Sequence, residues 1–260
     1  MQPVLPSVSN PSDPNYYTEY DYFEFTLNDQ GVWADISYID FVQIPIGLEL
    51  INADKTPGPA VAGLDHDGLA AVATALKNAG GDWAKLVGDA ATKAGQQPMS
   101  NTSLGPRVLG PGQAIVNNRL PGIFSGYFDK YIDDAWNFIK ANKIVCNTTS
   151  GDFTGFINDA NQLEFDNSQF ARILFNKPTS TDLLTCSTGP FVVDGPPQKA
   201  LLIPILCAAF NRSTIVQPGS QPNGVPENKY YIPIGTSGPA VNEYSSICKS
   251  HTFSLTQHGH

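Results

Sequence analysis

Charged side chains and long apolar runs are both scarce in this chain of 260 residues. Lys, Arg, Asp and Glu make up 15% of the residues and hydrophobic residues 41%, which excludes a highly charged disordered chain and a coiled coil. No stretch approaches the ~20 apolar residues that a membrane-spanning helix needs, so we expect no membrane partner. Basic residues number 15 against 24 acidic ones, and the net charge of −9 argues against nucleic acid as a partner.

The sequence also lacks the short motifs of several enzyme classes. It has no Gly-x-Ser-x-Gly elbow, no phosphate-binding glycine loop and no Cys-x-x-Cys pair. His251, His258 and His260 lie near the end of the chain, where an exposed tail is the simplest interpretation. His66 lies between two aspartates whose charge suits a helix N-terminus. We therefore predict no metal site, and we expect no cofactor.

Signals for export are mixed. Met1 is followed at once by Gln2 and Pro3, so no signal peptide is predicted within these residues. Three Asn-x-Ser/Thr triplets and an even number of cysteines nevertheless suit a secreted protein; the triplets begin at Asn101, Asn147 and Asn211. We predict an extracellular protein whose leader peptide is absent from this sequence.

The four cysteines allow three disulfide pairings. We favour a bond between Cys186 and Cys207, because each flanks an apolar segment in the same late region. Cys146 and Cys248 then pair by elimination.

The first part of the chain has the pattern of a β-sheet. Phe23, Phe25 and Leu27 alternate with polar residues, which predicts a half-buried strand. Turn-forming residues occupy 28–31, and a second β-like run follows over 32–50.

The middle of the chain is predicted to be helical. Residues 65–79 have an acidic start, helical apolar spacing and a Gly-Gly stop, and 82–94 follow the same pattern. Residues 124–142 form a third predicted helix with one apolar stripe, which consists of Phe128, Ile132, Trp136 and Ile139.

After Cys146 the pattern returns to short strands, predicted at 153–157, 162–165, 169–175 and 200–210. The last run is apolar throughout, so we predict a strand that is buried on both faces. The chain is therefore predicted to be mainly β with inserted helices, an α+β fold. Residues 1–50 and 146–260 form the β-rich core, and 51–145 form the helical lobe.

Two carboxylates in apolar strands are the candidate catalytic groups. Glu24 lies between Phe23 and Phe25, and burial beside aromatic rings raises a carboxyl pKa, as a general acid requires. Asp40 follows sixteen residues later in another apolar run. One protonated and one ionised carboxyl group on neighbouring strands can hydrolyse a glycosidic bond. Alternatively, both carboxylates merely occupy the polar faces of their strands.

The separation of these two carboxylates depends on the turn between them. If 29–31 form a tight hairpin turn, Asp40 lies roughly 13 Å along the strand from Glu24. If 29–35 form a wide loop, the two residues face each other at roughly 5 Å. An inverting glycosidase needs about 6.5–9.5 Å, which lies between these values.

The same block resembles the active-site region of glycoside hydrolase family 64, the β-1,3-glucanases with a thaumatin-like fold. The resemblance begins with Glu24-Phe25-Thr26-Leu27-Asn28 and Trp33 and continues through Tyr38-Ile39-Asp40-Phe41-Val42. It extends to Cys186-Ser187-Thr188-Gly189-Pro190-Phe191 and to the segment Leu206–Thr214. The proline-rich lead-in is similar to that of fungal members, and the position of Glu24 near the start implies a shortened member.

The resemblance implies an endo-acting enzyme that cleaves β-1,3-glucan with inversion, with Glu24 as general acid and Asp40 as general base. Thr26 and Asn28 match positions that line the family's cleft, and Trp33 would stack on a pyranose ring, although a core position is an equal alternative for Trp33 alone. The implied fold is a thaumatin-like barrel or sandwich core with a smaller helical lobe and a cleft between them.

We expect a monomer that needs no cofactor and whose partner is β-1,3-glucan. The alternative function is that of a non-catalytic glucan-binding or antifungal thaumatin-like protein.

Overall fold

A computed structural model describes residues 6–252 except 11, 17, 62, 89–106, 118, 218–220 and 236–237. These residues form a mixed α+β fold that divides into two compact units, 1–123 with 247–260 and 124–246. The boundary falls inside the segment 51–145, which is predicted from the sequence to be one helical lobe. The described strands form one four-stranded and three two-stranded sheets, and none of these sheets closes into a barrel. No helix among the described residues combines the length and apolar character of a bilayer crossing.

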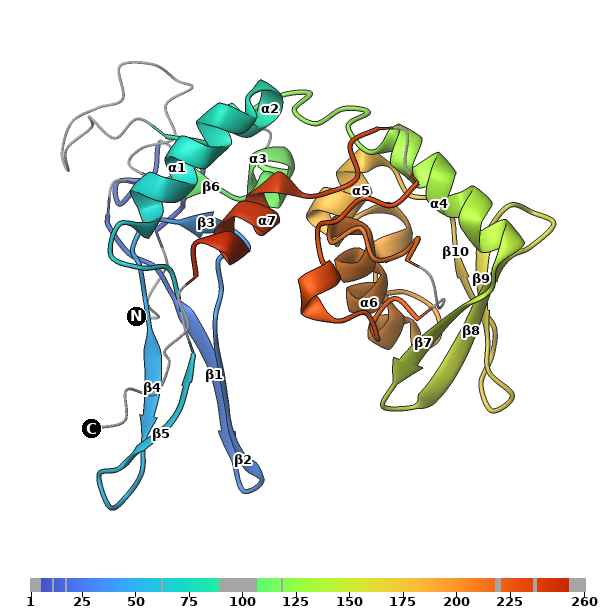
Figure 1. Cartoon of the computed structure of the whole chain (residues 1–260), viewed down its shortest axis with the longest axis horizontal. Helices are drawn as coiled ribbons and strands as arrows, with labels where there is room; N and C mark the ends of the chain where they lie inside the picture. The colour runs from blue at the N-terminus through green and yellow to red at the C-terminus, as the bar shows by residue number, and fades with distance from the viewer. Residues whose placement is uncertain are drawn as a thin grey trace. The chain divides into compact units, whose positions relative to one another are not determined.

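The first unit consists mainly of short antiparallel pairs. Strands β1 (Phe23–Asn28) and β2 (Gly31–Ile36) form one hairpin, and β4 (Leu48–Ile51) and β5 (Pro57–Val61) form another. Both hairpins extend as narrow ribbons (Figure 1). Strand β3 (Phe41–Val42) pairs with β6 (Val108–Leu109), and this buried pair forms the centre of the unit. Its helices are α1 (Gly68–Ala79), α2 (Gly81–Ala84) and α3 (Pro111–Val116).

The predicted helix over 65–79 is confirmed as α1, which buries Val72 and Leu76. The predicted helix over 82–94 is wrong over residues 85–88, because α2 ends at Ala84. Val87 instead forms a β-bridge with Val108, and the Gly88 amide donates to the Arg107 carbonyl at 2.7 Å. Strand-like pairing therefore replaces the helix at this point; residues 89–94 lie outside the described ranges.

The second unit is built on an antiparallel sheet in the order β10-β9-β8-β7. Its strands are β7 (Ile144–Thr148), β8 (Gly151–Ile157), β9 (Leu163–Asp166) and β10 (Ile173–Phe175), which confirms three of the predicted late strands. Helix α4 (Asp129–Ala141) packs against β8 and helix α6 (Lys199–Asn211) against β7. Short helices α5 (Ser180–Thr185), η1 (Gly189–Phe191) and η2 (Glu227–Lys229) follow the sheet, while α7 (Glu243–Ser250) crosses the unit boundary.

Helix α4 bears the predicted apolar stripe. Phe128, which precedes the helix, and Ile132, Trp136 and Ile139 within it are all at most 2% exposed. Burial of each large apolar side chain contributes roughly 1.5–3 kcal/mol, so this stripe is a major source of stability for the unit.

The predicted strand over 200–210 is wrong, because this segment forms helix α6. Leu202, Leu206 and Phe210 are buried at helical spacing, whereas Pro204 on another face is exposed. A continuous apolar run does not distinguish a buried strand from a buried helix.

Cys146 and Cys248 belong to different units, so their predicted disulfide stays a prediction. Cys186 and Cys207 are free thiols rather than the predicted disulfide. Cys186 and Cys207 are nevertheless neighbours in the second unit. Their mutual hydrogen bond, followed by burial, raises the pKa of the Cys207 thiol.

Candidate active site

The β1–β2 hairpin positions most of the candidate residues. Its strands pair from Phe23 with Ile36 to Asn28 with Gly31, which leaves a two-residue turn. The Asn28 side chain supports this turn by accepting a hydrogen bond from the Gln30 amide at 2.8 Å. Gly31 has a φ of 146°, which side-chain-bearing residues rarely adopt, so glycine suits the point where the chain reverses.

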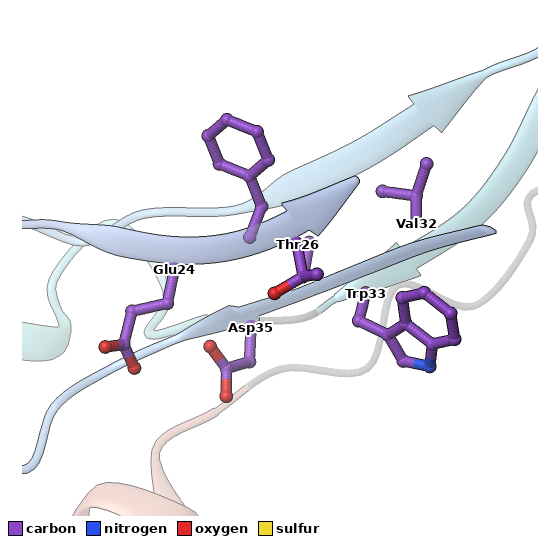
Figure 2. Close-up of a pocket in the computed structure, with 7 residues that line it drawn as sticks. Glu24, Thr26, Val32, Trp33 and Asp35 are labelled. Atoms are coloured by element: carbon purple, nitrogen blue, oxygen red, sulfur yellow. The ribbon is translucent and has the colours of Figure 1, made fainter. Parts of the chain in front are cut away.

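Alternation along the hairpin separates polar from apolar side chains. Glu24 pairs with Asp35 and Thr26 pairs with Trp33 across the strands, so these four share one face. Figure 2 shows their side chains on one side of the ribbon and Val32 on the other. The opposite face bears several apolar residues that are 48–69% exposed, namely Phe23, Phe25, Leu27 and Val32.

An open hollow of about 750 Å³ lies along this hairpin. It is lined by Glu24, Phe25, Thr26, Val32, Trp33, Ala34 and Asp35 (Figure 2). The Trp33 side chain is 53% exposed, so its ring is available to a ligand and the core alternative for Trp33 is excluded. An aromatic face beside carboxylate and hydroxyl groups can stack on a sugar ring while hydrogen-bonding to the hydroxyls at its rim.

Glu24 itself is exposed. The prediction that it is buried between Phe23 and Phe25 is therefore wrong, because neither ring is covered by another layer. Of the two predicted registers, the tight hairpin is confirmed and the wide loop is wrong. Asp35 rather than Asp40 faces Glu24 across the ladder.

Asp40 lines a second hollow, of about 260 Å³, just before β3. The Tyr22 hydroxyl donates a hydrogen bond to Asp40 Oδ2 at 2.7 Å, and the Tyr22 ring packs on Phe41 with centroids 5.8 Å apart. Burial, the hydrogen bond to Asp40 and, more weakly, the charge of Glu24 raise the pKa of the Tyr22 hydroxyl. Tyr22 thus contacts the Asp40 carboxylate, and the charge of Glu24 affects the pKa of its hydroxyl group.

The backbone at Asp40 is fixed by glycine. The Gly110 amide donates to the Asp40 carbonyl at 2.7 Å. A Cβ atom at Gly110 would lie 2.1 Å from the Ile39 carbonyl oxygen, so only glycine permits this approach. The close contact holds Asp40 at the entry to the β3–β6 pair.

Asp21 links the start of the hairpin to the end of β3. Its Oδ2 accepts hydrogen bonds from the backbone amides of Gln43 at 2.9 Å and Ile44 at 3.1 Å. Burial raises the pKa of the Asp21 carboxyl group, and the backbone hydrogen bonds oppose this rise. The link keeps residues 21–24 beside the segment that bears Asp40.

Two of these residues were missed by sequence reasoning. Asp35 could have been found from the predicted tight turn, because pairing Asn28 with Gly31 places residue 35 opposite Glu24. Tyr22 had no sequence signal, because its hydroxyl meets a residue 18 positions away through the fold. Asn28 is on the predicted strand, but its side chain supports the turn.

Comparison with known proteins places this fold among the glycoside hydrolases. The family model for family 64, described as beta-1,3-glucanase, matches residues 1–259, and the chain therefore belongs to this family. Two glucan endo-1,3-beta-glucosidases, from Arthrobacter sp. (strain YCWD3) and Cellulosimicrobium cellulans, are each 28% identical over 228 residues. The aligned region covers 85% of this chain but only 38% of each relative.

Solved structures agree on the fold. A laminaripentaose-producing beta-1,3-glucanase in complex with laminaritetraose superposes with a TM-score of 0.73 at 24% identity, covering 96% of this chain and 63% of its own. A family 64 beta-1,3-glucanase domain from Clostridium beijerinckii gives a TM-score of 0.70 at 19% identity, covering 95% and 59% respectively. This chain thus spans less than two thirds of the length of these relatives.

The contact between Tyr22 and Asp40 predicts energetic coupling. A double-mutant cycle of Tyr22→Phe and Asp40→Ala, measured by urea unfolding, should give a coupling free energy of about 1–2 kcal/mol. Either single substitution already removes the hydrogen bond to the carboxylate, so the double variant does not lose it a second time. The matched control is Tyr20→Phe with Asp40→Ala, since the Tyr20 hydroxyl donates to the Pro6 carbonyl instead. Equal coupling in the two cycles would contradict this role of Tyr22.

The raised pKa of Asp21 predicts a pH-dependent stability. Burial makes the folded protein bind this proton more tightly than the unfolded chain does, so protonation stabilises the fold. Relative to Asp21→Asn, the free energy of unfolding of the wild type should therefore be highest below the ordinary pKa of 3.8 and should fall as pH rises through the raised pKa. Urea unfolding from pH 3 to pH 7 measures this difference. A difference that stays constant or grows with pH would contradict the assignment.

Proposed function

We propose that this chain is an endo-acting β-1,3-glucanase that inverts the anomeric carbon. The observation that carries the proposal is the polar face of the β1–β2 hairpin, where Glu24, Thr26 and Trp33 line one open hollow. A carboxyl group, a hydroxyl group and an exposed indole ring on one surface provide for proton transfer, hydrogen bonding and stacking on a sugar. Membership of a β-1,3-glucanase family supports β-1,3-glucan as the substrate.

In the proposed reaction, Glu24 donates its proton to the glycosidic oxygen as the bond from C1 to that oxygen breaks. Asp40 accepts a proton from a water molecule whose oxygen attacks C1 from the opposite face. The glycosidic oxygen leaves as a hydroxyl group that carries the proton from Glu24, C1 gains the hydroxyl group of the water molecule, and Asp40 holds the second proton of that water, so that both protons are accounted for. Exposure of Glu24 allows it to exchange its proton with solvent between turnovers.

The positions of Tyr22 and Asp40 support the roles of the two carboxylates. Because the Tyr22 hydroxyl bonds to Asp40, the second carboxylate is held near Tyr22 rather than directly opposite Glu24. Asp40 therefore does not take the position across from Glu24 at which a retaining nucleophile would lie at ~5 Å, which supports inversion.

Other residues of the hairpin would bind the sugar around the reacting bond. Thr26 would hydrogen-bond to sugar hydroxyls and Trp33 would stack on a ring, while Asn28 would contribute through the turn that it supports. We further propose a thaumatin-like core, a monomeric state and secretion. The exposure of Asn147 in its glycosylation triplet supports secretion.

A non-catalytic glucan-binding protein is the second candidate. The observation that favours it is that Glu24 and Asp40 line two different hollows among the described residues. The polar hairpin face would then bind the polysaccharide without cleaving it.

Substitution of the two carboxylates distinguishes these functions. Wild-type protein incubated with laminarin should release oligosaccharides, and Glu24→Gln and Asp40→Asn should each reduce the rate by about 10²-fold or more, since each removes one proton transfer. The control Asp29→Asn changes a carboxylate at the tip of the same hairpin and should leave the rate unchanged.

Two outcomes would count against the catalytic proposal. If Glu24→Gln and Asp40→Asn release sugars as fast as wild type, the assigned roles are wrong. If wild type is pulled down by insoluble β-1,3-glucan but releases no sugar from laminarin, the protein binds glucan without cleaving it and the second candidate is correct.

A further inference from the structure

Asp35 is an acidic residue that the proposed reaction does not use. It lies directly opposite Glu24 in the β1–β2 ladder and two residues from Trp33 on the same strand and face. All three side chains line the 750 Å³ hollow, and Figure 2 shows both carboxyl groups directed to the same side. Residues directly opposite each other have Cβ atoms about 4.5–5.5 Å apart, so the two carboxylates are close neighbours.

This pairing is unfavourable for the fold alone. Like charges directly opposite each other destabilise a strand pair. Within the ranges that the structure describes, neither Glu24 nor Asp35 forms an ion pair with Lys, Arg or His. Asp35 is also exposed, so it contributes no packing that would offset the repulsion. Its position therefore calls for an explanation other than stability.

Binding of a sugar in the hollow explains why a carboxylate occupies position 35. A carboxylate only accepts hydrogen bonds, and each of its two oxygens can take a sugar hydroxyl. The indole of Trp33 is about 7 Å along the same strand, which is close to the width of a pyranose ring. A ring stacked on Trp33 would thus bring its rim hydroxyls to Asp35 and its linkage toward Glu24.

We propose that Asp35 is a substrate-positioning residue, whose carboxylate accepts hydrogen bonds from the hydroxyls of the sugar ring stacked on Trp33. By fixing that ring, Asp35 holds the neighbouring glycosidic oxygen against Glu24. This inference rests on the proposed glucanase function and deepens it by naming a determinant of substrate binding.

The test compares Asp35→Ala with the control Asp29→Ala, which removes a carboxylate from the tip of the same hairpin. Asp35→Ala should raise KM for laminarin by about tenfold or more, as expected when a hydrogen bond to a charged group is lost, and should change kcat by less than about threefold. Its Tm should be equal to or higher than that of wild type, because the repulsion with Glu24 is removed. Asp35→Asn, which keeps one acceptor oxygen, should give an intermediate KM.

Binding of laminaritetraose, measured by calorimetry in a Glu24→Gln background, separates this inference from the function on which it rests. Binding that is weakened about tenfold by Asp35→Ala but not by Asp29→Ala supports the inference. Equal binding with and without Asp35 overturns the inference and leaves the glucanase proposal intact. A lowered Tm with unchanged KM for Asp35→Ala assigns Asp35 a structural role and also overturns the inference. If the Glu24→Gln protein binds no laminaritetraose, the inference and the proposed function both fail.

Discussion

The tight turn between β1 and β2 is the constraint on which the candidate site depends. Because Asn28 pairs with Gly31, every later pair in the ladder is determined, and Glu24 must face Asp35 while Thr26 faces Trp33. A shift of one residue would move all of these side chains to the opposite face. The Asx hydrogen bond to Gln30 and the φ of Gly31 therefore determine which residues line the hollow.

A second set of contacts places Asp40 relative to that hairpin. Asp21 binds the amides after β3, Gly110 binds the carbonyl of Asp40, and Tyr22 binds its carboxylate. These hydrogen bonds join residues on both sides of the hairpin to the buried β3–β6 pair. The hairpin is exposed on both faces, so its position depends on this anchored base rather than on a covering layer.

Local patterns in the sequence predict the parts of the fold that are determined locally. The alternation over 23–27, the turn residues at 28–31 and the stripe of α4 each specify one element, and each is confirmed. The burial of Glu24 was predicted wrongly because alternation reveals two faces but not whether another layer covers them. Segment 200–210 was misassigned because its apolar run suits a helix or a strand. The Tyr22–Asp40 bond depends on how distant segments pack, which a pattern within one segment does not contain.

Glu24 and Asp40 are proposed to act on opposite faces of a sugar ring, with water between the ring and Asp40. The anomeric configuration of the first product tests this proposal most directly, because the spacing of the two carboxylates decides the stereochemistry. Proton NMR recorded within the first minutes of laminarin cleavage should show the new reducing end as the α-anomer, before mutarotation. Initial formation of the β-anomer would contradict this proposal, because retention requires a carboxylate nucleophile at ~5 Å from the acid.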